Sequence, residues 1–344
     1  MITLLTTLIL FGVIILGHEL GHFLIANWVG IPAEEFSIGM GPKIYQRKTN
    51  KTLFSLRALP IGGYVKFVGE DEKSDDPRAF NNAKVWKRFL VILSGPLMNF
   101  FLAILLLTIS FMSFGTVRTS THILETIDAS PAQEAGLQKG DKIIEINGRN
   151  LENMSEEKAI ETIRDVIKSE GGQPLRLTIL RDGEAKEFEM LPNYNTEKNT
   201  YEIGIYFGRL QRHGPLSSIK LAFIQTGRLI ILMIQLVGSM IFKGQVLNEV
   251  VGPVGIVGEI NKAVQSGIHD VINFAITITL NLGIINLIPF PALDGGRLAL
   301  LVVEGLRGRP IDSQKEGYIH FVGFVLLMLL MIVVTFKDIV RQWF

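Results

Sequence analysis

The sequence predicts an α-helical membrane protein with four transmembrane helices, a cytoplasmic-side β-hairpin region, an extracytoplasmic soluble domain of mixed α/β structure and an interfacial amphipathic helix. Hydrophobic residues make up 48% of the 344 residues and the mean hydropathy is +0.33, which lies between soluble and wholly membrane-embedded chains. Four segments approach the ~20 apolar residues that a helix needs to cross a bilayer. A long polar stretch, 115–209, separates the second from the third and alternates as strands do.

Composition excludes several function classes. The net charge of +1 gives no electrostatic reason to expect nucleic acid as a partner. The chain has no cysteine, which excludes disulfides, thiolate zinc ligands and a cysteine nucleophile. Any metal in this protein must therefore be held by histidines and carboxylates.

The first apolar segment, residues 1–30, carries no charged side chain before His18. A secretory signal peptide would begin with basic residues and end at a cleavage site of small residues, and the segment has neither feature. We therefore expect it to remain in place as the first transmembrane helix.

This segment contains an H-E-x-x-H motif, formed by His18, Glu19 and His22. With 6 histidines and 33 acidic residues in the chain, such a motif arises by chance in roughly one sequence in a hundred. Positions i and i+4 share one face of a helix, so His18 and His22 can bind a single cation. Glu19 is then placed to act as general base on a water molecule. Polar groups at bilayer depth are costly and indicate function, here peptide hydrolysis within the membrane.

Residues 31–88 are predicted to form short strands on the cytoplasmic side. Alternating patterns cover Glu35–Ile38 and Leu53–Leu56, and a further run, Gly62–Phe67, ends the segment. We expect a turn at residues 39–42. The sheet is either a plain surface feature or an exposed strand edge that pairs with an extended substrate.

The other predicted spans are residues 89–114, 270–296 and 318–344, with a cytoplasmic loop at 297–317. Four asparagines in these spans are too polar to face lipid and should point into the helix bundle: Asn99, Asn273, Asn281 and Asn286.

Residues 210–269 are predicted to hold an interfacial amphipathic helix and a connector. Within Pro215–Phe242, polar side chains recur at helical spacing and form one stripe: Ser218, Gln225, Arg228, Gln235 and Ser239. Such a helix fits the membrane interface better than a span.

Basic residues predict the orientation in the cell inner membrane. They are concentrated between the first two spans and between the last two, and no Lys or Arg precedes Lys43. The positive-inside rule makes both loops cytoplasmic, so the N-terminus and residues 115–209 are expected outside the cytoplasm. His22 and the loop after Pro291 then both lie toward the cytoplasmic side.

Residues 115–209 contain a Pro-Ala turn, a short helix, the strand around Ile143, an Asn147-Gly148 turn, a helix at about 155–169 and strands at 175–181 and 184–191. This string resembles a PDZ domain of the bacterial, circularly permuted type. PDZ domains bind peptide ends by strand addition. The resemblance implies a peptide groove bordered by the final strand, Tyr201–Ile205, including Ile203, Gly204 and Ile205.

Two histidines do not complete a catalytic zinc site, which usually has three protein ligands. The third should be His, Glu or Asp near the cytoplasmic side, and the segment 286–296 (NLIPFPALDGG) supplies Asp294. Two prolines interrupt the third span and the glycines permit a tight turn. We expect Asp294 on irregular backbone at membrane depth, where it needs a cation partner.

H-E-x-x-H in the first span, N-x-x-P-x-P-x-L-D-G in the third and a PDZ domain between them resemble the site-2 protease family of intramembrane zinc metalloproteases. Further matching segments are SGPLMNF (94–100), LPIGGY (59–64) and GPVGI (252–256). The resemblance is closest to the bacterial branch that cuts membrane-anchored anti-sigma factors and remnant signal peptides. The chain departs from the two-PDZ members of that branch by having a single PDZ domain.

The resemblance implies Zn²⁺ bound by His18, His22 and Asp294, with Glu19 as the catalytic base. Substrates would be single-span membrane proteins, and peptide ends or ectodomain stubs would meet the PDZ domain. A substrate helix must unwind before attack, because its backbone is internally hydrogen-bonded. The residues implied to hold the unwound chain are Asn99, Asn286, Gly62, Gly63 and Tyr64; the asparagines alternatively serve only to join helices.

Two readings of other classes stay open. One is a PDZ-bearing membrane scaffold with a structural zinc site, which would have no need of Glu19. The other is a metal transporter, in which a PDZ domain has no evident role. The remaining histidines lack partners at ligand spacing, and we expect surface or core roles for them: His122, His213, His269 and His320.

Overall fold

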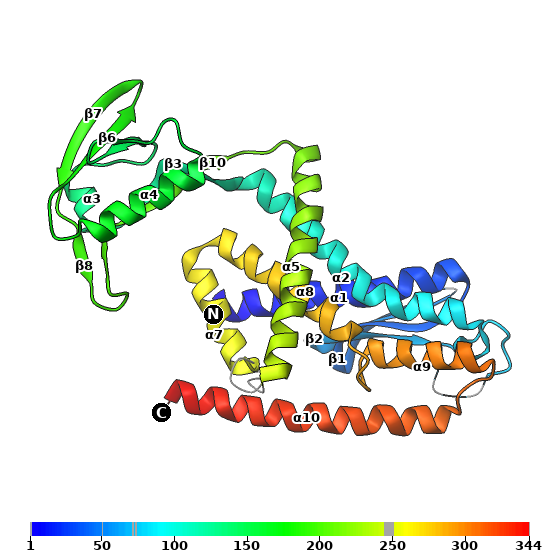
Figure 1. Cartoon of the computed structure of the whole chain (residues 1–344). Coiled ribbons are helices and arrows are strands. Elements are labelled where there is room, and N and C mark those ends of the chain that lie inside the picture. Colours follow the sequence, from blue (N-terminus) through cyan, green and yellow to red (C-terminus); the bar gives the residue numbers. More distant parts are fainter. Residues whose placement is uncertain (1, 50, 71, 73, 244–250, 344) are drawn as a thin grey trace. The chain divides into compact units, whose positions relative to one another are not determined.

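The computed structural model describes residues 2–49, 51–70, 72, 74–243 and 251–343 (Figure 1). The chain divides into two compact units. The first comprises Met1–Ser110 and Pro215–Phe344, and the second comprises Phe111–Gly214. The sequence-predicted connector falls partly on residues 244–250, which lie outside the described residues.

Five described helices are long and apolar enough to cross a membrane, which identifies a multi-pass membrane protein. They are α1 (Ile2–Val29), α2 (Val85–Ser113), α5 (Pro215–Lys243), α8 (Ile268–Leu287) and α10 (Ser313–Trp343). The sequence predicted four spans, and α5 is the additional helix that meets the length and composition criteria.

Helix α5 presents its small side chains to the protein and its large apolar ones outward. Ser218, Ala222 and Thr226 recur every four residues and are buried, whereas Leu216 and Phe223 are exposed. Ser218 was predicted to belong to a polar stripe facing water, and that prediction is wrong because the small hydroxyl permits close helix packing. Arg228 and Gln235 of the stripe are exposed.

The β region consists of two long strands, β1 (Ala33–Lys48) and β2 (Leu53–Phe67), rather than three short ones. Residues 35–38 of β1 pair with both 53–56 and 63–66 of β2. The predicted turn at 39–42 is wrong. These residues continue β1, and Gly39 and Gly41 adopt φ of 84° and 83°, which bends the strand without ending it.

Two helices of the first unit were not predicted. Helix α7 (Pro253–Ser266) precedes α8 in the predicted connector, and α9 (Asp294–Arg307) occupies most of the predicted cytoplasmic loop. Asp294 is therefore the first residue of a helix rather than part of an irregular segment. The irregular backbone is confined to residues 288–293, where the prolines interrupt the chain.

A hydrophobic cluster joins the elements around one end of the first unit. It contains side chains of α1, β1, β2, α2 and α9, together with Phe80 of the short 3₁₀ helix η1 (Phe80–Asn82). Val91 is fully buried in this cluster and Ala26 likewise. This packing holds α1, α2 and α9 in a fixed relation, and these are the helices that carry the histidines, their supports and Asp294.

The second unit is a curved sheet with one main helix. The strand order is β10-β3-β4-β6-β7, with β5 paired to β4, and β8 pairs with β9 separately. The elements are β3 (Thr116–Thr126), α3 (Pro131–Glu134), β4 (Lys142–Ile146), β5 (Arg149–Asn150), α4 (Glu156–Ser169), β6 (Leu175–Arg181), β7 (Glu184–Met190), β8 (Asn193–Asn195), β9 (Thr200–Glu202) and β10 (Ile205–Gln211). The predicted helix at 155–169 and the strands at 175–181 and 184–191 are confirmed within one residue.

The last strand of this unit differs from the prediction. Tyr201–Ile205 is not one strand, because Gly204 adopts φ of 76° and separates β9 from β10. Strand β10 pairs with β3 on one side only and forms the edge of the sheet.

Candidate metal centre

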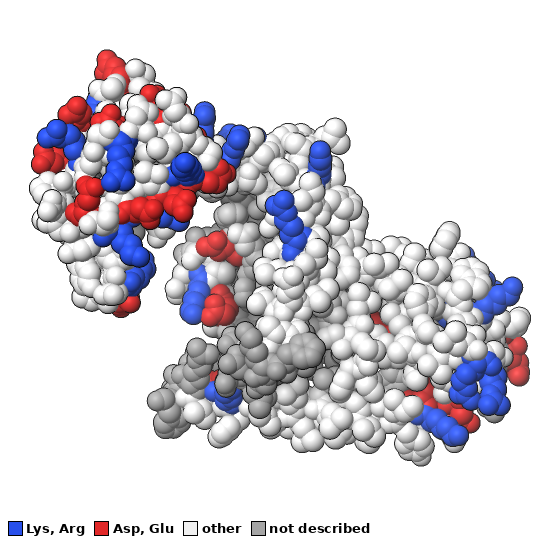
Figure 2. Space-filling model, in the orientation of Figure 1, with Lys and Arg blue, Asp and Glu red and all other residues white. Residues whose placement is uncertain are grey.

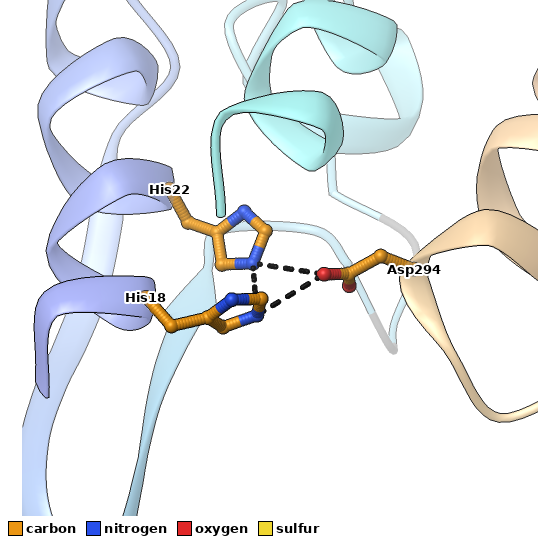
Figure 3. Close-up of side chains that lie close together, drawn as sticks. All are labelled: His18, His22 and Asp294. Atoms are coloured by element: carbon orange, nitrogen blue, oxygen red, sulfur yellow. Dashed lines mark hydrogen bonds and ion pairs between the residues drawn. The ribbon is translucent and has the colours of Figure 1, made fainter. Parts of the chain in front are cut away.

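His18, His22 and Asp294 converge on one point from two helices (Figure 3). His18 Nε2 lies 3.2 Å from His22 Nε2. Asp294 Oδ2 lies 3.1 Å from His18 Nε2 and 3.5 Å from His22 Nε2. Both histidines are 7% exposed. Among the described residues this is the one cluster of three histidine or carboxylate side chains with metal-ligand spacing.

The spacing of these three atoms fits a tetrahedral zinc ion. Ligand atoms about 2.0–2.2 Å from a tetrahedral centre lie roughly 3.3–3.6 Å from one another. The separations of 3.1, 3.2 and 3.5 Å are close to that range. Asp294 Oδ2 is also buried without a hydrogen-bond partner among the described residues. A buried carboxylate oxygen in that state needs a cation.

Helix α2 supports both imidazole rings from behind. His22 Nδ1 is 2.8 Å from the carbonyl oxygen of Val91, and His18 Nδ1 is 3.1 Å from the side-chain amide of Asn99. A Cβ atom at Gly95 would overlap both rings, and one at Gly21 would overlap the Ser94 carbonyl. The two glycines therefore allow α1 and α2 to approach closely where the histidines lie.

The loop before α9 fixes Asp294. Gly295 and Gly296 pack on the backbone of Leu287–Pro291, where a Cβ on either would collide with carbonyl groups. Ala292 adopts a left-handed φ of 76°, and its amide donates a 2.9 Å hydrogen bond to His320 Nδ1 of α10. His320, expected to be a surface or core residue, thus holds the loop that carries Asp294.

Glu19 lies beside the edge of β2. A Cβ placed on Gly63 would be 3.5 Å from Glu19 Cγ. The sequence analysis predicts Glu19 as the catalytic base and Gly62–Tyr64 as part of the substrate-binding edge. In the structure, Gly63 lies next to Glu19.

The side chain of Tyr64 is occupied within the sheet. Arg57 donates hydrogen bonds to the Tyr64 hydroxyl and, at 2.9 Å, to Glu35. Burial raises the pKa of the Glu35 carboxyl, but hydrogen bonds from Ser55, Arg57 and Tyr64 outweigh burial and hold that pKa below its usual value. Burial and the neighbouring Glu35 raise the pKa of Tyr64, so its hydroxyl stays a hydrogen-bond donor at neutral pH.

The other predicted substrate residues lie at different depths. Asn99 is fully buried next to His18, whereas Asn286 is half-buried in the last turn of α8. Gly62 adopts φ of 87° and is therefore constrained to glycine.

Sequence reasoning missed several supporting residues. Gly95 was seen only as part of a matching segment, and no local signal shows that its missing side chain makes room for two histidines. Arg88 of α2 and Glu304 of α9 form a buried ion pair, 216 positions apart in the chain, which the sequence alone could not pair.

The second unit has a cavity of about 460 Å³ between α4 and the β9–β10 segment. Ile203, Gly204 and Ile205, the predicted groove residues, all line it. Arg164 and Lys168 of α4 line the opposite side. The free edge of β10 borders the same cavity.

The model of peptidase family M50 matches residues 6–330. The chain is 37% identical to a Clostridium acetobutylicum protein, covering 96% of this chain and 95% of that one. It is 31% identical to the zinc metalloprotease RasP of Geobacillus kaustophilus, covering 98% and 97% respectively.

It is also 29% identical to the regulator of sigma-W protease RasP of Bacillus subtilis, covering 98% of both chains. Part of the chain is similar to the solved PDZ domain of an SdrC-like protein from Listeria innocua, with 24% identity, 27% of this chain and 99% of that chain covered, and a TM-score of 0.22. By its match over nearly the whole length, the chain belongs to peptidase family M50, the site-2 type of intramembrane zinc metalloproteases.

Proposed function

We propose that His18, His22 and Asp294 hold the catalytic zinc of this intramembrane protease and that Glu19 is its general base. The observation that carries the proposal is the spacing of 3.1–3.5 Å among three buried donor atoms from two helices. Glu19 distinguishes the proposal from a structural zinc site, because a structural site has no use for a carboxylate beside the ligands.

The chain's own residues account for the proton transfers. Bound at this site, zinc would supply Lewis-acid activation of water and of the scissile carbonyl. Glu19 accepts the proton of the attacking water and passes it to the leaving amide nitrogen. The apolar helices around the site exclude bulk water, which strengthens the electrostatic effect of each charged group.

The edge of β2 at Gly63–Val65 is suited to hold an unwound substrate. A substrate helix has no free backbone groups, so a segment must leave the helix before its carbonyl is attacked. An extended segment can pair with a strand edge through main-chain hydrogen bonds. Gly63 lies next to Glu19, so a chain bound along this edge would pass the general base.

Contacts at the helix ends support four spans rather than five. Lys87, at the start of α2, donates to the Val29 carbonyl at the end of α1, so α2 returns antiparallel to α1. Helix α7 contacts the start of α1 through Asn261 and Thr3, 2.8 Å apart. The end of α2 and helix α7 thus lie at the same end of the bundle. Gln211, shortly before α5, pairs with Thr116, shortly after α2, so α5 also begins at that end. A helix that begins there and leads to α7 at the same end does not cross the membrane.

The direction of α5 agrees with this reading, since it runs across α1 and α10 rather than along them (Figure 1). We place α5 in the membrane interface, with its large apolar side chains in the acyl boundary. Figure 2 shows charged side chains gathered at the α9 end of the first unit and smaller groups near α7 and on the upper part of α5, with a largely uncharged surface between them. The basic loops at that end favour its placement in the cytoplasm, with the N-terminus and the second unit outside.

We propose that the substrates are single-span membrane proteins, such as anti-sigma factors and remnant signal peptides. The support is the family membership and the name of the Bacillus subtilis relative, a regulator of sigma-W protease. The second unit would act as a PDZ domain that receives peptide ends or ectodomain stubs along β10. The free edge of β10 and the adjoining cavity supply the strand-addition geometry for that role.

The Glu19→Gln variant tests the mechanism, because it keeps the metal ligands and removes the base. We expect purified Glu19→Gln protein to bind zinc as the wild type does and to cleave a membrane-anchored test peptide at least about 100-fold more slowly. Cleavage at the wild-type rate would contradict the proposed base.

Metal content of Asp294→Ala tests the ligand set separately. We expect zinc binding to fall sharply, because two histidines alone leave the site incomplete. Undiminished zinc would remove Asp294 from the site. If the protein were a scaffold with structural zinc, it would unfold when zinc is removed, and Glu19→Gln would have no effect. If it were a transporter, it would carry zinc across the membrane of sealed vesicles.

A further inference from the structure

Asn99 contacts His18 at Nδ1, the ring nitrogen that does not face Asp294. Its side-chain Nδ2 lies 3.1 Å from His18 Nδ1. The residue is fully buried, and its Oδ1 has no hydrogen-bond partner among the described residues. The backbone carbonyl of Asn99 is also near the Thr279 hydroxyl of α8, at 3.4 Å. The Asn99 side chain thus contacts the ring nitrogen of His18 that does not face Asp294.

A histidine that binds a metal through Nε2 needs a hydrogen-bond acceptor at Nδ1. The Nε2 atoms of His18 and His22 both point toward Asp294, so Nε2 is the ligand atom in each ring. A neutral imidazole that binds metal through Nε2 carries its proton on Nδ1 and needs an acceptor there. The Val91 carbonyl provides this acceptor for His22 at 2.8 Å.

For His18 the corresponding acceptor would be the Asn99 amide oxygen, once the amide group is turned. If the amide nitrogen faces Nδ1, its N–H donates a hydrogen bond and Nδ1 must accept it. The neutral imidazole then carries its proton on Nε2. A protonated Nε2 cannot bind a metal ion. A rotation of the amide group by 180° has almost the same shape and places Oδ1 against Nδ1. The orphaned Oδ1 is therefore satisfied in the orientation that leaves Nε2 free for a cation.

We propose that Asn99 is a positioning residue that fixes the tautomer and ring orientation of His18, instead of holding substrate or only joining helices. This inference rests on the proposed zinc site. It predicts an order of zinc affinity set by the acceptor at position 99. A carboxylate is a stronger acceptor than an amide, and an apolar side chain provides none.

The test measures zinc affinity of full-length, detergent-purified Asn99→Asp and Asn99→Leu by competition with a chelator. We expect Asn99→Asp to bind zinc at least as tightly as the wild type. We expect Asn99→Leu to bind on the order of 10- to 100-fold more weakly while keeping its helical circular dichroism. The visible absorption spectrum of the Co²⁺-loaded proteins should be retained in Asn99→Asp and altered in Asn99→Leu. Ser110→Ala, another buried polar change on α2, is the matched control and should leave zinc affinity unchanged.

The alternatives give other results, and each overturns the inference. If Asn99 only joins helices, Asn99→Leu keeps zinc affinity and Asn99→Asp is the damaging change. If Asn99 only holds substrate, both variants keep zinc affinity and raise KM. Should Asn99→Leu fail to fold, Asn99→Ala carries the same expectation. Equal zinc binding by wild type and His18→Ala would instead reject the proposed site itself, whatever the Asn99 variants do.

Discussion

The geometry of the candidate metal centre depends on glycines as well as on the three side chains that would bind the metal. Gly95 faces the two imidazole rings, and any Cβ at this position would overlap both. The rings are buried and packed between α1 and α2, so they have little room to move aside. The positions of the two imidazole rings therefore depend on close helix packing at Gly95.

Gly95→Ala should abolish most zinc binding although it improves helix propensity. Alanine favours a helix interior over glycine by about 1 kcal/mol, so α2 itself is not weakened. The added methyl group displaces one or both histidines, and we expect zinc affinity to fall on the order of 100-fold. Metal analysis and chelator competition measure the loss.

Gly12→Ala on α1 is the matched control for this change. A Cβ at Gly12 meets no atom within 4 Å, so zinc binding should be unchanged. Equal zinc affinity in Gly95→Ala and Gly12→Ala would show that the rings do not depend on this contact.

At the scale of elements, α2 and α9 are joined by the Arg88–Glu304 ion pair. The two side chains are only 8% and 9% exposed. Helix α9 begins at Asp294 and α2 supports both histidines, so this pair connects the two helices that flank the candidate metal centre. Breaking a buried ion pair leaves one uncompensated charge, whereas replacing both partners by apolar groups is often tolerated.

We expect Arg88→Met and Glu304→Leu each to lower the free energy of unfolding by about 3–5 kcal/mol. The double variant should recover most of that loss, since no charge is left buried alone. Thermal unfolding in detergent, with zinc content measured in parallel, provides the comparison. Losses that simply add in the double variant would mean that the two side chains do not act as a pair.

The second unit has its own pH-sensitive element. Burial raises the pKa of the Asp141 carboxyl, but hydrogen bonds from Arg181 and from the Gln138 amide outweigh burial and hold that pKa below its usual value. A depressed carboxyl pKa contributes stability above the unfolded pKa of about 3.9, and the contribution is lost as pH falls through the folded pKa.

A fragment spanning the second unit should therefore lose stability below about pH 4. It contains its complete hydrophobic cluster, so we expect it to fold alone. Arg181→Met should lower its free energy of unfolding at pH 7 and flatten the acid dependence, because the buried Asp141 carboxylate loses its partner. Urea unfolding followed by circular dichroism at pH 7 and pH 4 checks both expectations. An unchanged slope with pH in Arg181→Met would assign the acid sensitivity to other carboxyls.

At the scale of the whole molecule, the sequence was informative where a pattern is local. Apolar runs of spanning length predicted α1, α2, α8 and α10, and the spacing within H-E-x-x-H predicted that two histidines share a helix face. Asp294 was found because glycines and prolines mark its loop. The order of the spans and the positions of basic residues together indicated that the loop and His22 meet.

The sequence was uninformative where a feature depends on distant partners. The double pairing of residues 35–38 with two parts of β2 arises from bends at glycines whose φ the sequence does not show. The sequence predicts a loop where α9 lies, because the apolar face of α9 is recognised only once the β1–β2 sheet and α2 cover it. The role of His320 requires the fold of a loop 28 positions away.

The count of spans is open to a direct test, because the chain has no native cysteine. Single cysteines at three exposed positions, Thr119→Cys, Ser266→Cys and Arg309→Cys, sample the second unit, the end of α7 and the segment after α9. With α5 in the interface, a membrane-impermeant maleimide added to intact cells should modify the first two. The third should react only after the cells are opened.

The pattern of labelling separates span count from orientation. Residues 119 and 266 lie on either side of α5 in the chain. If both cysteines are labelled from the same side of the membrane, α5 does not cross it, and this holds for either orientation. Labelling of Thr119→Cys from outside and of Ser266→Cys only in opened cells would make α5 a fifth span. The contacts of α7 with Thr3 and with Asp338 at the far end of α10 would then have to break, since they hold α7 at the end where α1 begins. Labelling of Arg309→Cys alone in intact cells would keep the four spans and reverse the orientation, placing the metal centre toward the outside.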